Sequence, residues 1–120
     1  MRSDIAGMLH FQKLDVYQRS IEFLALANRI LGQLPRGNAG LADQLRRAGQ
    51  SIPQNIAEGC GRTTRADKAK HYTIATGSAM ECASHLDVMK TDELIESDLY
   101  QGGIDVLERI VAMLTKLIDP

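Results

Sequence analysis

Basic side chains that could bind phosphate groups are concentrated in one stretch of this 120-residue sequence. Residues 46–71 contain six Lys or Arg against two acids, a net charge of +4, whereas the whole chain has a net charge of −1. Guanidinium groups match phosphate oxygens well in geometry. The candidates for such contacts are Arg46, Arg47, Arg62, Arg65 and Lys68.

The same cations have a second interpretation, in which they form ion pairs within the chain or with a neighbouring copy. Glu58 and Glu81 are candidate partners, and residues 81–120 carry nine acids against three bases, a net charge of −6. A near-neutral protein has no overall field that attracts nucleic acid. The ion-pair interpretation is therefore favoured over phosphate binding.

Other reactive side chains lack the spacing that catalysis or metal binding needs. His71 and His85 are expected on one helix, about 21 Å apart along its axis, which is too far to share a metal. Glu81 lies four positions before His85 and is expected to form a surface pair with it. Cys60 has no neighbouring His base and is interpreted as a small filler residue. We expect no catalytic residue, no cofactor and no metal, and we predict that the protein is not an enzyme.

Helices are expected to position these side chains, because apolar residues recur at three- and four-residue steps and no alternating strand pattern is present. The expected helices span residues 15–34, 39–58, 65–90 and 98–117. Helices of about 20 residues joined by short loops favour an all-α, antiparallel up-down-up-down four-helix bundle. We place this bundle at residues 14–118 and expect a flexible N-terminal tail over residues 1–13.

Local signals at the helix ends support these boundaries. Asp15 with Gln18 and Thr64 with Asp67 have the spacing of capping boxes. The Gly59-Cys60-Gly61 segment is expected to end the second helix, since glycine accepts the left-handed geometry of a helix C-terminus.

Pro53 falls inside the apolar stripe of the second helix, where it removes a backbone donor and crowds the carbonyl of Gly49. We predict a kink at this proline. The structural motif around it comprises Gly49, Pro53, Asn55, Glu58 and Gly59. A kink held by local hydrogen bonds is favoured over a binding notch that the kink opens.

The first and last helices carry more apolar residues than one buried face needs. Either the core is wide, or apolar surface is buried between subunits; the second is favoured, because a bundle of this size has little interior to spare. The interface candidates are Phe23, Leu26, Ile30, Val106, Ile110 and Met113. The third helix has a cleaner apolar seam that runs from Tyr72 to Met89.

The composition and the apolar runs of the sequence indicate the kind of core and the cellular location to expect. Aromatic residues make up only 4% of the chain, so aliphatic side chains and Met must fill the core. The two cysteines are too few for a disulfide scaffold. No signal peptide is recognisable at residues 1–11, and no apolar run approaches the roughly 18 residues of a membrane span. We therefore expect a cytoplasmic protein with no membrane association.

Several segments of the sequence resemble one protein family. Leu45-Arg46-Arg47-Ala48, Ser51-Ile52-Pro53, Asn55-Ile56-Ala57-Glu58-Gly59 and Gly61-Arg62 closely resemble the signature of the family named "four helix bundle protein". Leu14-Asp15-Val16-Tyr17-Gln18 and the segment Ile74–Glu81 resemble two further parts of its pattern, so the resemblance extends from Phe11 to about Leu117. The first members of this family were found encoded in intervening sequences of bacterial 23S rRNA genes.

The resemblance implies a bundle that assembles as a homo-oligomer, typically a ring of five subunits, with no known catalytic activity. We therefore expect a scaffold or adaptor whose first partner is another copy of itself. The accessory protein of diversity-generating retroelements is a distantly similar, markedly basic branch. This chain departs from that branch in its net charge of −1. An alternative function rests on the segment of net charge +4: association with RNA, or with a nucleic-acid-processing protein, through a basic patch on the second helix and the start of the third.

Overall fold

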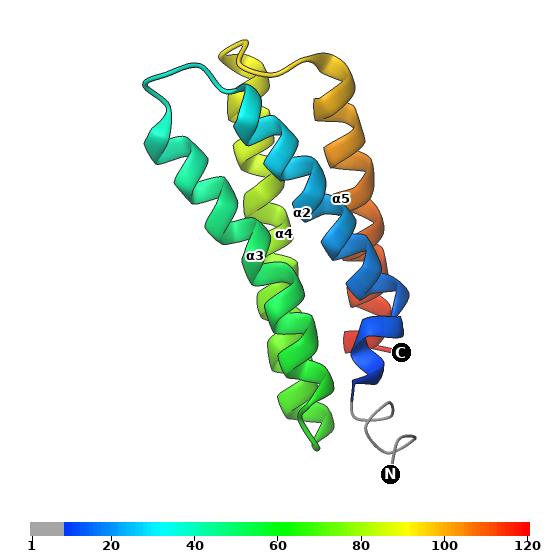
Figure 1. The fold of residues 1–120 in the computed structure, drawn as a ribbon. Coiled ribbons are helices and arrows are strands. Elements are labelled where there is room, and N and C mark those ends of the chain that lie inside the picture. The colour runs from blue at the N-terminus through cyan, green and yellow to red at the C-terminus, as the bar shows by residue number, and fades with distance from the viewer. Residues whose placement is uncertain (1–8) are drawn as a thin grey trace.

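The computed structural model describes residues 9–120. Within this range the elements are the 3-10 helix η1 (His10–Lys13) and the α-helices α2 (Asp15–Gln33), α3 (Ala39–Cys60), α4 (Arg65–Thr91) and α5 (Ser97–Ile118), with no strand. Consecutive helices run in opposite directions along the bundle in Figure 1. The predicted all-α four-helix architecture is confirmed.

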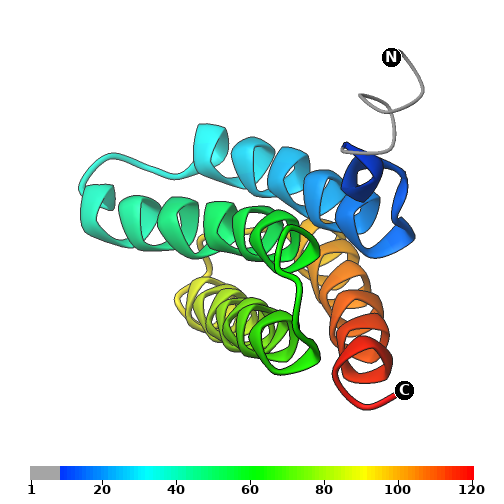
Figure 2. The ribbon, with the colours of Figure 1, turned by 90° about the horizontal axis from the view of Figure 1, so that it is seen from below.

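Each of the four α-helices packs against two others, so α2–α3 and α4–α5 form two pairs on opposite sides of the bundle. The helix α2 contacts α3 and α5, and α4 contacts α3 and α5 as well. The α2–α3 pair therefore lies on one side of the molecule and the α4–α5 pair on the other, as Figure 2 shows. No helix in the described part of the chain is long and apolar enough to cross a membrane.

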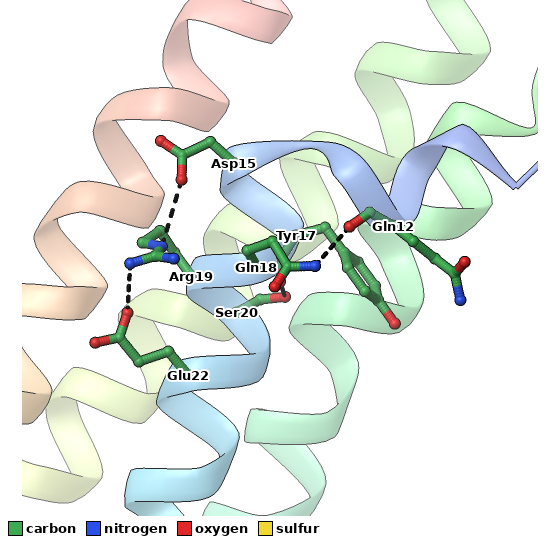
Figure 3. A network of polar contacts seen from close by, with 7 residues as sticks. All are labelled: Gln12, Asp15, Tyr17, Gln18, Arg19, Ser20 and Glu22. Atoms are coloured by element: carbon green, nitrogen blue, oxygen red, sulfur yellow. Dashed lines mark hydrogen bonds and ion pairs between the residues drawn. The ribbon is translucent and has the colours of Figure 1, made fainter.

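One of the two predicted N-terminal caps is confirmed. The Thr64 hydroxyl accepts a hydrogen bond from the Asp67 backbone N–H at 3.1 Å, and α4 begins at the next residue. The prediction for Asp15 is wrong, because Leu14 is the N-cap of α2 and its side chain has no acceptor. Gln18 instead donates from its side chain to the backbone carbonyl of Gln12 in η1 (Figure 3).

The two glycines at the end of α3 differ from the expected stop signal. Gly61 has a φ of −80°, so it does not adopt the left-handed conformation. Gly59 is buried inside the helix, and a Cβ placed there would lie 2.6 Å from Cε1 of Tyr72. Glycine is required at position 59 because the ring on α4 approaches the backbone of α3.

Part of the segment predicted as a flexible tail is helical instead. Residues 1–8 lie outside the described residues, but His10–Lys13 form η1, which contacts both α2 and α3. The ring of Phe11 meets the ring of Tyr17 edge to face, with 5.0 Å between their centroids. This contact fixes η1 across the start of α2.

The core of the bundle is aliphatic, as its composition predicts. The predicted seam of α4 is confirmed, because Tyr72, Ala75, Ala79, Cys82, Leu86 and Met89 are all buried. The one buried polar side chain among the core residues described is Ser20, whose hydroxyl donates to the carbonyl of Tyr17 at 2.6 Å (Figure 3). Local hydrogen bonding therefore satisfies this hydroxyl.

The structure corrects the predicted subunit interface. Four of the six candidates are buried within the single chain: Phe23, Ile30, Val106 and Ile110. Leu26 and Met113 are half-buried and pack against the same core. The prediction that Phe23, Ile30, Val106 and Ile110 contact another copy is therefore wrong, because these four side chains face the interior.

Candidate interaction surfaces

A polar network joins α3 to α4 beside Pro53. The Asn55 side-chain amide donates to the Ser51 carbonyl at 2.9 Å, and Ser78 Oγ of α4 donates to Ser51 Oγ at 2.8 Å. Asn55 Oδ1 lies 3.3 Å from His71 Nδ1. Because the Asn55 amide nitrogen is used as a donor, its oxygen accepts from His71. The motif residue Asn55 therefore connects the two helices.

Pro53 lies inside α3 and is buried. Gly49, four residues earlier, is also buried, and a Cβ there would make ordinary contacts with Leu24 and Phe23 of α2. The kink at Pro53 stays a prediction.

A groove next to this proline separates α2 from α3. It has a volume of about 420 Å³ and a lining that is mainly apolar, with two amide side chains on α3. We call it the α2–α3 groove; its lining residues are Phe11, Tyr17, Ile21, Leu24, Gln50, Pro53, Gln54 and Ala57. Ile21 in this groove is 40% exposed although its side chain is purely hydrocarbon.

Two of the five candidate basic residues are engaged at the end of α3. Arg62 forms an ion pair with Glu58 at 3.0 Å. Glu58 is one of the two acids that the sequence suggested as ion-pair partners. The ammonium group of Lys68 donates to the carbonyls of Cys60 at 3.1 Å and Gly59 at 3.4 Å. The Cys60 carbonyl lies at the end of α3, where helix carbonyls lack their usual backbone donor, and the Gly59 carbonyl also accepts from the Arg62 backbone N–H at 3.2 Å.

The remaining arginines do not join this cluster. Arg47 approaches Asp43 at 3.7 Å, whereas Arg46 and Arg65 make no hydrogen bond or ion pair within residues 9–120. Arg46 lies about 24 Å from Arg62 along the helix axis. The five candidates therefore form two separate groups rather than one phosphate-binding patch.

The outer side of α4 carries three exposed large apolar side chains among polar residues such as Thr73, Glu81 and Asp87, which are also exposed. Ile74, Met80 and Val88 are 43%, 55% and 44% exposed, and the small residues Gly77 and Ser84 are exposed between them. No Lys or Arg occurs from residue 72 to residue 89. Large apolar side chains that are exposed on the outer side of a bundle helix are candidates for contact with another molecule.

This side of α4 continues into a groove against α5. The groove has a volume of about 340 Å³; its lining residues are Ala79, Met80, Ala83, Ile104, Leu107, Glu108, Val111 and Ala112. Met80 belongs to both features and connects them. We call the groove and the exposed apolar residues of α4 together the α4–α5 surface.

Sequence reasoning missed the α4–α5 surface, although a signal was present. Ile74, Met80 and Val88 lie on the side of the third helix opposite its seam, and a soluble bundle helix would normally carry charges there. The expected apolar surplus of the first and last helices is also present, since Ile21 and Leu117 are each 40% exposed.

Two titratable groups of α4 belong to the core and offer no reactive site. Burial raises the pKa of the Cys82 thiol to about 12, so this thiol stays protonated. Burial and a 3.6 Å hydrogen bond with Cys60 raise the pKa of Tyr72.

The predicted surface pair forms between Glu81 and His85 at 3.2 Å. Within residues 9–120 no group of three or more His, Cys, Asp or Glu side chains could hold a metal ion.

Comparisons with known proteins identify relatives of this architecture. A family model described as "23S rRNA-intervening sequence protein" matches residues 12–116. The fold is similar to the crystal structure of a protein with unknown function from the S23 ribosomal protein family of Bacteroides thetaiotaomicron VPI-5482, with a TM-score of 0.81 and 25% sequence identity. That alignment covers 88% of this chain and 99% of the other. No curated protein matches the sequence.

Proposed function

Because this chain belongs to the 23S rRNA-intervening sequence protein family, we propose that it acts as a homo-oligomeric scaffold or adaptor rather than as an enzyme. The observation that carries this proposal is the α4–α5 surface. Its exposed member Met80 lines a mainly apolar groove, and Ile74 and Val88 are further exposed apolar side chains of the same helix. Contiguous apolar surface of this kind marks protein–protein contact sites on soluble proteins.

A second copy is the partner that this surface fits best. The surface lies on two regular helices, carries few charges and alternates large with small residues, so a helical neighbour can approach closely. The family resemblance makes a ring of five subunits the expected assembly. Such a ring would present several identical faces to further partners and gain affinity from multivalency. The cytoplasm is the proposed location.

Light scattering coupled to size-exclusion chromatography tests the proposal. We expect the wild-type protein to have a mass that is a multiple of the 13.2 kDa of one chain, five-fold for the proposed ring. Met80→Lys should yield monomers at micromolar concentration, because it places a charge in the centre of the contact. Leu117→Lys is the matched control, since Leu117 is also exposed (40%) but lies outside the α4–α5 surface. A monomeric wild-type protein would contradict the proposal.

Association with RNA is a second proposal, favoured by the side chains of Arg46 and Arg65, which no other group in residues 9–120 engages. A ring would repeat both arginines in every subunit. Filter binding to structured RNA at two salt concentrations tests it. We expect binding at low salt that weakens steeply as salt rises, because phosphate contacts release counterions. No binding at low salt would contradict it.

A further inference from the structure

We draw no further inference here: the strongest candidate, the set of mainly apolar grooves between α2 and α3, between α4 and α5 and between α2 and α5, carries none, because nothing in the structure shows which of these grooves another molecule covers or what that molecule is.

Discussion

Replacing Phe23 with alanine is expected to lower the free energy of unfolding by about 3–5 kcal/mol, because the substitution leaves a cavity in a packed interior. The Phe23 ring is completely buried within one chain. This loss is a large part of the stability of a small domain. Urea denaturation followed by circular dichroism, at fixed protein concentration, measures it.

Ile21→Ala is the control for Phe23→Ala, since Ile21 lies two positions away on the same helix and is 40% exposed. We expect a much smaller loss of stability for this control in a monomeric background. If Phe23→Ala left the free energy of unfolding almost unchanged and only dissociated the oligomer, Phe23 would belong to a subunit contact and the assignment of the core would be wrong.

Two adjacent glycines of α5 are expected to respond in opposite ways to alanine. A Cβ at Gly103 would lie 2.7 Å from Cδ1 of the buried Leu86 and 3.3 Å from Cδ2 of Leu26. At Gly102 the nearest atom, Cδ1 of Leu26, is 3.5 Å away, which is an ordinary contact. Alanine improves helix propensity equally at both positions, by up to about 1 kcal/mol.

Gly103→Ala should therefore be about 1–3 kcal/mol less stable than Gly102→Ala, the cost of overpacking a full core. Gly102→Ala should be at least as stable as the wild-type protein. Thermal and urea unfolding of both variants measure this difference in stability. The gain in helix propensity is the same in the two variants, so the difference reports the cost of packing the added methyl group. Equal stabilities would show that α5 does not approach α4 as closely as Gly103 implies.

The helices and their order follow directly from the sequence, because the apolar period of a bundle helix is strong over twenty residues. The seam of α4 from Tyr72 to Met89 is the clearest example. Its small residues Ala75 and Ala79 are buried where neighbouring helices pack. Periodicity of this kind depends only on local geometry, so one sequence is enough to recognise it.

The helix ends are less predictable, because contacts with other segments decide them. Gln18 has the spacing of a capping residue, but η1 lies close enough to accept its hydrogen bond. Gly59 has the position of a helix stop, but the ring of Tyr72 is what requires the missing side chain. The roles of Gln18 and Gly59 therefore depend on contacts with Tyr72, which is distant in sequence from Gly59, and with η1, a turn that has no strong sequence pattern.

The assignment of apolar stripes to core or contact surface could not be made from the sequence. A helix with two stripes, such as α2, can bury both when its two neighbours in the bundle lie at a wide angle around it. Phe23 and Ile30 are buried in this way within one chain. Exposed apolar side chains remain on α2 and α5, at Ile21 and Leu117, and on α4, where no basic side chain occurs from residue 72 to residue 89.

Oxidation of Met80 by dilute peroxide, followed by mass spectrometry of peptides, tests most directly whether another copy covers the α4–α5 surface. Methionine reacts according to its exposure, and Met80 is 55% exposed in the single chain. We expect Met80 of the wild-type protein at micromolar concentration to be oxidised many times more slowly than in the urea-unfolded chain. A rate in the folded protein comparable to that of the unfolded chain would show this surface to be in contact with water and would contradict the account.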